Sequence, residues 1–267
     1  MTDPRTSPQQ PAPFHWRTVR WCLRRELRRT CRWHLANRTL YDEDGGTMRW
    51  LRQDRDRFLE TLDRVVEEMR EIAGLHALPN SGSRLMVELA VYTLAADAAL
   101  RRHGVGTDCA HSVVADIGWD LYSRMLRLSS LPARVVSRNP GRRLRWTIRT
   151  LLVFPFRPVG APGYKTRVFR EGDDLQTHFT HCPPQSFARK VATRRADPEL
   201  LEAFRQSWCL YDWPGADIIA GDGRRGHYRR PRTLSAGDPV CDMCWRARGA
   251  RPSARSGDTH DQAEALK

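Results

Sequence analysis

Four cysteines in the last third of the chain stand among polar side chains that can take part in chemistry. They are Cys182, Cys209, Cys241 and Cys244. A thiol that only fills space usually has apolar neighbours, whereas a thiol near histidine, arginine or a carboxylate can act as a nucleophile or bind a metal. We therefore expect the functional site in this part of the sequence.

Two of these thiols, Cys182 and Cys241, are candidate nucleophiles. Cys182 directly follows His181, and a helix expected to begin after Pro183 would place its positive end beside the sulfur and favour the thiolate. Cys241 can face an arginine of the segment 230–232 across a hairpin. Either thiol can therefore be activated by positive charge.

The same cysteines offer a metal site as the alternative interpretation. Cys241 and Cys244 form half of a zinc motif, and Cys182 and Cys209 are available to complete a zinc or iron–sulfur centre. Along an extended strand, positions 241 and 243 face one way and positions 242 and 244 the other, so only a tight turn would let both sulfurs chelate. We expect no metal or cofactor, and keep the four-cysteine site as the alternative.

Two common classes of site are disfavoured by the spacing of glycines. The stretches 160–163 and 221–223 lack the spacing and the strand-to-helix context of a phosphate-binding loop, and we expect both to be turns. The sequence also has no Gly-x-Ser-x-Gly elbow, which disfavours a serine hydrolase of the common sheet type.

The composition predicts an ordinary folded protein. The chain has 267 residues, of which 40% are hydrophobic, and seven cysteines whose spacing is not that of a disulfide scaffold. We therefore expect reduced thiols and a cytoplasmic location. The N-terminal residues lack the apolar segment of a signal peptide, and the longest apolar run, 151–156, is far shorter than a membrane-spanning helix requires.

The net charge of the chain is +14, and its densest cluster of arginines is in residues 17–33, where tryptophans stand among them. Such a pattern can recognise an acidic surface, but the only lysines are Lys165, Lys190 and Lys267, so an arginine-favouring coding bias also explains the excess. A solvated helix face is the favoured interpretation. We expect neither a nucleic acid nor a membrane as partner, and leave open an acidic protein bound through residues 17–33 and a homo-oligomer.

Residues 15–155 have the periodicity of a helical region. Apolar residues at three- and four-residue steps predict a helix over about 48–73, while Asn80 and either Thr107 or Asp108 can cap two further helices. The apolar stripe expected for the third helix consists of Val114, Ile117, Leu121, Met125 and Leu128.

From residue 156 to 248, short alternating segments punctuated by glycine and proline predict strands and turns. The expected strands are 164–169 and 175–179, which form a hairpin, and 216–220, 227–230 and 240–245, with two helices over about 184–196 and from 198 onward. The fold class is therefore α+β, with an N-terminal helical half packed on a small antiparallel sheet with two inserted helices. Residues 1–14 and 249–267 are expected to be disordered tails.

Three segments of this region together resemble the L-2-amino-thiazoline-4-carboxylic acid hydrolase family. They are Thr177–Pro183, the Trp208-Cys209-x-x-Asp212 step, and Arg230–Asp242 with its Arg-x-Arg-Thr start. The resemblance covers about residues 160–245. It implies a bacterial hydrolase in which water adds to the amidine-like carbon of a 2-amino-thiazoline ring, the C–S bond breaks and N-carbamoyl-cysteine forms.

The resemblance also implies roles for particular residues. The nucleophile would be Cys182 or Cys241, and the proton-transfer group would be Asp212 or Asp242. An arginine can hold a substrate carboxylate through two N–H groups, and an acid can protonate the leaving sulfur. The candidate substrate-binding residues are Arg230, Arg232, Thr233 and His181. We therefore expect a small heterocyclic or amide-like substrate of secondary metabolism.

Overall fold

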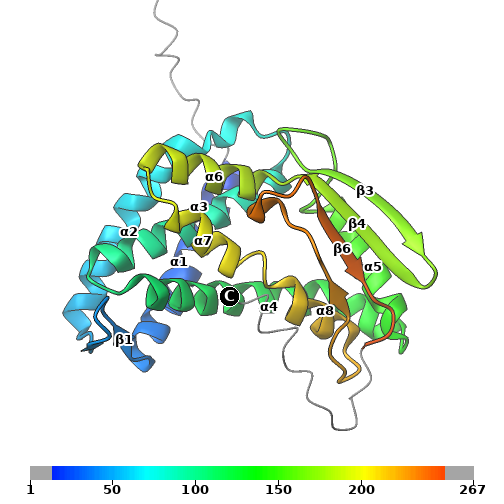
Figure 1. Ribbon diagram of the computed structural model, residues 1–267, viewed down its shortest axis with the longest axis horizontal. Helices are drawn as coiled ribbons and strands as arrows, with labels where there is room; N and C mark the ends of the chain where they lie inside the picture. Colours follow the sequence, from blue (N-terminus) through cyan, green and yellow to red (C-terminus); the bar gives the residue numbers. More distant parts are fainter. Residues whose placement is uncertain (1–13, 250–267) are drawn as a thin grey trace, which may run out of the picture.

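The computed structural model describes residues 14–249, so the expected tails, 1–14 and 249–267, lie almost entirely outside the described residues. Within this range the α+β class is confirmed, since a large helical part lies beside a small antiparallel sheet (Figure 1). The helices are α1 (Phe14–Asn37), α2 (Arg52–Ala73), α3 (Ser81–Arg102), α4 (Thr107–Val136), α5 (Pro140–Val153), α6 (Pro183–Arg195), α7 (Glu199–Gln206) and α8 (Asp212–Ala220). The strands are β1 (Leu40–Tyr41), β2 (Thr47–Met48), β3 (Lys165–Glu171), β4 (Asp174–His181), β5 (Tyr228–Arg229) and β6 (Cys241–Trp245).

The beginnings of α2 and α3 follow from local hydrogen bonds. Helix α4 differs from the prediction, because Thr107 and Asp108 lie inside it and the residue before it, Gly106, has no side chain to cap it. Asn80 caps α3, because its side-chain oxygen accepts the N–H of Ser83 at 2.8 Å. Helix α2 begins later than expected, since Thr47–Met48 pairs with β1 and Leu51 is extended. The N–H of Leu51 donates to the side chain of Asp54 at 2.9 Å, which supports the start of the helix just after it.

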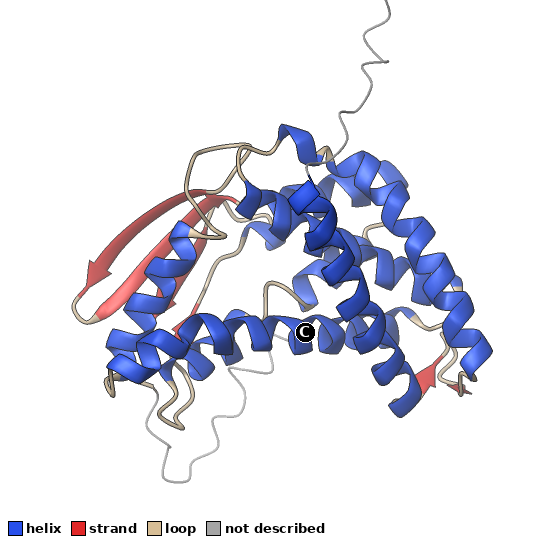
Figure 2. Cartoon of the chain, turned by 180° about the vertical axis from the view of Figure 1, so that it is seen from behind, coloured by secondary structure: helices blue, strands red, loops and turns tan. Residues whose placement is uncertain are grey.

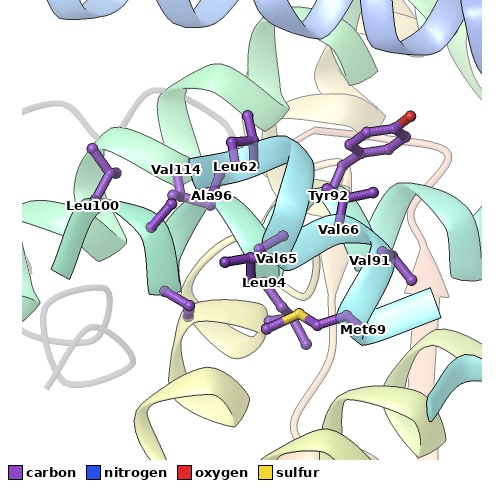
Figure 3. Close-up of a cluster of buried hydrophobic side chains, with 14 of the residues drawn as sticks. Leu62, Val65, Val66, Met69, Val91, Tyr92, Leu94, Ala96, Leu100 and Val114 are labelled. Atoms are coloured by element: carbon purple, nitrogen blue, oxygen red, sulfur yellow. The ribbon is translucent and has the colours of Figure 1, made fainter. Parts of the chain in front are cut away.

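Helix α3 lies at the centre of the main hydrophobic core. Side chains of α2 and α4 pack around it, as the close-up of this cluster shows (Figure 3). Phe187 of α6 and Phe204 of α7 belong to the same core, so the two inserted helices pack on the N-terminal helices. The prediction that Leu128 of α4 belongs to the core is wrong, since its side chain is 72% exposed. The buried stripe of α4 beyond Ile117 runs through Tyr122 and Leu126 instead.

The four-stranded sheet has the order β3-β4-β6-β5 and is antiparallel throughout. The predicted hairpin is confirmed, and its turn is shorter than expected because Glu171 pairs directly with Asp174 and Gly172 takes a positive φ of 58°. Helix α5 covers one face of the sheet, seen from behind in Figure 2. The other face carries the polar side chains that alternate with the buried ones.

The segment 216–220 was expected to be a strand and instead forms the end of α8. Pro214 and Gly215 suggest a turn in the sequence, but Pro214 lies in the first helical turn, where the missing N–H would have no partner within the helix. Gly215 packs closely on Leu126, whose methyl group would lie 2.8 Å from an added Cβ. The helix therefore fits the wall of α4, and it ends at Gly221, which has a φ of 59°.

The arginines of α1 are largely paired with carboxylates of the neighbouring helices. Arg24 and Arg28 both bind Asp63 of α2, and Arg20 binds the buried Glu88 of α3. Much of the charge of residues 17–33 is thus balanced within the protein, and an acidic partner there stays a hypothesis. Among residues 14–249, no helix is both long and apolar enough to cross a membrane.

Candidate functional site

A cavity of about 110 Å³ lies between the inner face of the sheet and helices α4, α5 and α8. The start of α6 and the segment that joins α7 to α8 complete its wall. Most of the wall is apolar or aromatic. The exceptions include three thiols, a carboxyl and a guanidinium, supplied by Cys182, Cys209, Cys241, Asp212 and Arg230.

Asp212 is the first residue of α8 and is mostly buried, with 15% of its side chain exposed. Its Oδ2 accepts the hydroxyl of Tyr228 at 3.1 Å, and Tyr122 of α4 is a second hydroxyl partner. Arg230 lies 3.6 Å away from the same oxygen. Burial raises the pKa of Asp212, against the opposing effects of Arg230 and the two tyrosines. A carboxyl whose pKa is raised in a cavity is a candidate for proton transfer.

Arg230 is held in place by Asp212 and by two further groups, and it keeps one N–H unused. Its Nη2 donates to the carbonyl of Cys209 at 2.6 Å, and its guanidinium stacks 4.8 Å from the ring centre of Trp213. Only 4% of the side chain is exposed, and Nε has no hydrogen-bond partner within the described part of the chain. A buried N–H without a partner is costly, so Nε is suited to receive an acceptor atom of a ligand.

Burial works against the thiolate that the sequence predicts at Cys182, and it also disfavours the thiolate of Cys209. Cys182 does precede α6, as predicted, and the backbone N–H of Gln185 favours its thiolate. Burial is the larger effect and raises the pKa of Cys182. Burial also raises the pKa of Cys209 to about 11, although its sulfur lies 3.1 Å from the hydroxyl of Ser235.

Cys241 has the more polar surroundings. Its sulfur accepts the backbone N–H of Leu234 at 3.2 Å and lies 3.5 Å from the hydroxyl of Thr233. Thr233 therefore supports a candidate nucleophile and is not itself part of the cavity wall. Of the predicted residues, the structure thus brings Cys182, Cys241, Asp212 and Arg230 together, with Thr233 directly behind them.

Three other predicted residues lie away from the cavity. Asp242 faces the opposite side of the sheet, where its carboxylate accepts the side chain of Arg232 at 2.8 Å. His181 is fixed by the carbonyl of Gly163 at 2.6 Å and by the hydroxyl of Ser186 at 3.2 Å. Asp242, Arg232 and His181 therefore each have a structural partner that accounts for their position.

The four cysteines of the alternative metal site do not face the same side of the sheet, because side chains alternate along strand β6. Cys241 faces the cavity, whereas Cys244 lies on the other face with its sulfur 3.8 Å from Asp174. In the part of the chain that the structure describes, no group of three or more His, Cys, Asp or Glu side chains is arranged to bind a metal ion. The alternation of positions 241 to 244 expected from the sequence is confirmed.

Sequence reasoning missed the two tyrosines that bind Asp212. Tyr228 stands two positions before Arg230 in an extended segment, and side chains two positions apart in such a segment face the same side. The sequence therefore contained a signal that Tyr228 lies near Arg230. Tyr122 is different, because its hydroxyl is set among apolar residues of α4 and nothing in its local sequence marks it.

Comparison with models of protein families, with curated proteins and with solved structures finds no match to this chain.

Proposed function

We propose that the protein is a hydrolase that opens a small cyclic amidine or amide-like substrate in this cavity, with Asp212 as the proton-transfer group. The observation that carries the proposal is the buried carboxyl of Asp212, whose pKa is raised by burial and which lies beside a guanidinium and three thiols. Carboxyls with shifted pKa values in a small-molecule cavity are typical of general acids and bases.

The proposed reaction needs two proton transfers. Water adds to the amidine carbon, and ionised Asp212 takes one proton from it and delivers it to the ring nitrogen. The second proton of the water passes to the leaving sulfur as the C–S bond breaks, which leaves a carbonyl and a free thiol. For a ring without sulfur, the same sequence breaks a C–N bond and protonates the nitrogen.

Arg230 supports this reaction by binding and by orientation. Its free Nε can donate to a carboxylate of the substrate, while its Nη1 stays near Asp212. The hydroxyl of Tyr228 donates to Asp212 and fixes the carboxyl, so that its other oxygen can face the water. Positioning of this kind lowers the barrier because the reacting groups are already aligned.

The attacking group can be the water itself or the thiol of Cys241, and both routes use Asp212. The thiol route forms a covalent intermediate that water then releases. Burial raises the pKa values of Cys182 and Cys209, so we assign neither of these two thiols as the nucleophile. A Cys182→Ala, Cys241→Ala double variant separates the routes: the water route predicts that it keeps most of its activity, and the thiol route predicts complete loss.

The proposal is tested by incubating the purified protein with 2-amino-thiazoline-4-carboxylate and a panel of cyclic amidines and lactams. We expect release of a thiol or amine and a product mass increased by one water. Folded protein that turns over none of the panel, although it binds one of these rings, would identify the cavity as a binding site without hydrolase activity.

A further inference from the structure

We propose further that the ligand of this cavity carries an apolar body, one hydrocarbon ring or a branched chain of similar size, attached to its anionic head. The wall formed by α5 and the loop after it carries this inference. Every residue that this part of the chain contributes to the cavity is apolar: Ile148, Leu151, Leu152 and Phe156. The chemical step rests on the proposed function, whereas the binding of such a ligand does not.

Apolar residues also face the cavity from the elements on either side of α5. Leu126 of α4 and Phe179 and Met243 of the sheet continue the same surface. A ligand with polar atoms on all sides would lose its hydrogen bonds to water here and find no partners, which is unfavourable. A hydrocarbon body against this wall is stabilised by burial instead.

The polar groups of the wall come from other elements. Arg230 and Asp212 lie on the side formed by α8 and the segment after β5, and Gln185 comes from the start of α6. Since Nε of Arg230 is buried and has no partner among the described residues, it fixes where an anionic head binds. The body of the same ligand then lies against α5.

The volume limits the size of this body. The cavity measures about 110 Å³, and an engineered protein cavity of about 150 Å³ takes up one benzene molecule. A single six-membered ring is therefore the upper limit for the body. Long acyl chains and fused rings are too large.

Isothermal titration of the full chain with benzoate and with pyrimidine-5-carboxylate tests the inference. The two anions have the same shape, but the second replaces two ring CH groups with nitrogens that need hydrogen bonds. We expect benzoate to bind at least tenfold more tightly. Equal affinities, tighter binding of pyrimidine-5-carboxylate, or no binding of benzoate at millimolar concentration would overturn the inference.

A pair of neighbouring variants places the body in the cavity. Leu152→Phe fills the space beside α5, so benzoate should bind at least tenfold more weakly. Val153→Phe is the matched control, because Val153 is 72% exposed on the same helix and should leave binding unchanged. Unchanged affinity in folded Leu152→Phe would contradict the assignment.

Benzoate binding without turnover of any ring would reject the hydrolase proposal alone. Turnover limited to polar rings would reject the apolar body alone.

Discussion

At the scale of single residues, the state of Asp212 depends on a competition between burial and its neighbours. Arg230, Tyr228 and Tyr122 favour the ionised carboxylate, and loss of contact with water disfavours it. The balance lies on the side of burial, so the pKa is raised. The charge of this carboxyl in turn helps to raise the pKa values of Tyr164, Cys182 and Cys209.

The activity should therefore depend on pH through Asp212. If the ionised form takes the proton from water, kcat/KM should rise with pH through a pKa above the ordinary carboxyl value of about 4. Tyr228→Phe removes a hydrogen bond to the charged form, which lowers the pKa in the native protein, so the variant's profile should shift to still higher pH. A profile that is the same in both proteins would contradict this role of Asp212.

The thiols should differ in reactivity within one chain. Cys22 is exposed on α1, whereas burial raises the pKa of Cys182 and of Cys209 and reduces the thiolate that alkylating reagents attack. Iodoacetamide at pH 8 should label Cys22 first and the other two only after unfolding. Peptide mass spectrometry measures the rates, and labelling of Cys182 as fast as that of Cys22 would show that its thiolate is accessible.

At the scale of elements, the sequence predicted what depends on neighbouring residues. The cap at Asn80, the hairpin around Gly172 and the start of α6 at Pro183 all follow from local signals. The prediction failed for α8, where Pro214 and Gly215 suggest a turn but packing against Leu126 favours a helix. Tertiary packing overrides local propensity there, and no pattern within the segment reveals it.

Helices α1, α2 and α3 are joined by a buried charge. Glu88 of α3 is fully buried and binds Arg20 of α1 and Arg70 of α2. Glu88→Ala leaves both arginines without this partner, and we expect it to lower the free energy of unfolding by about 3–5 kcal/mol. Glu67→Ala removes a 70% exposed partner of the same Arg70 and should cost less than about 1 kcal/mol.

Urea unfolding of the two variants measures the difference. Equal losses of stability would show that the burial of Glu88 does not strengthen its contribution.

At the scale of the whole molecule, the helical core and the sheet could be foreseen as parts, but the cavity between them could not. Its wall draws on segments far apart in the sequence, from Met86 of α3 to Trp245 of β6. The prediction of Asp212 and Asp242 as equal candidates shows the difficulty. Only the assembled sheet shows that Asp242 lies on the outer face beside Arg232.

A buried carboxyl in the main core should make global stability depend on pH. Burial raises the pKa of Asp97 to about 6, although Arg101 and His111 favour its charge. Between about pH 4 and 6 the folded protein therefore binds a proton that the unfolded chain has released, so this residue's contribution to stability falls as pH rises. The free energy of unfolding of wild type minus that of Asp97→Asn should decrease over this range, and a constant difference would contradict the raised pKa.

The most direct measurement is kcat/KM for thiol release from 2-amino-thiazoline-4-carboxylate by wild type, Asp212→Asn and Asp242→Asn, with melting temperatures as the check on folding. We expect Asp212→Asn to lose at least about 100-fold in rate, as removal of a general acid–base does. Asp242→Asn, on the outer face, should keep the wild-type rate. Wild-type activity in Asp212→Asn would contradict the proposed role of the cavity carboxyl.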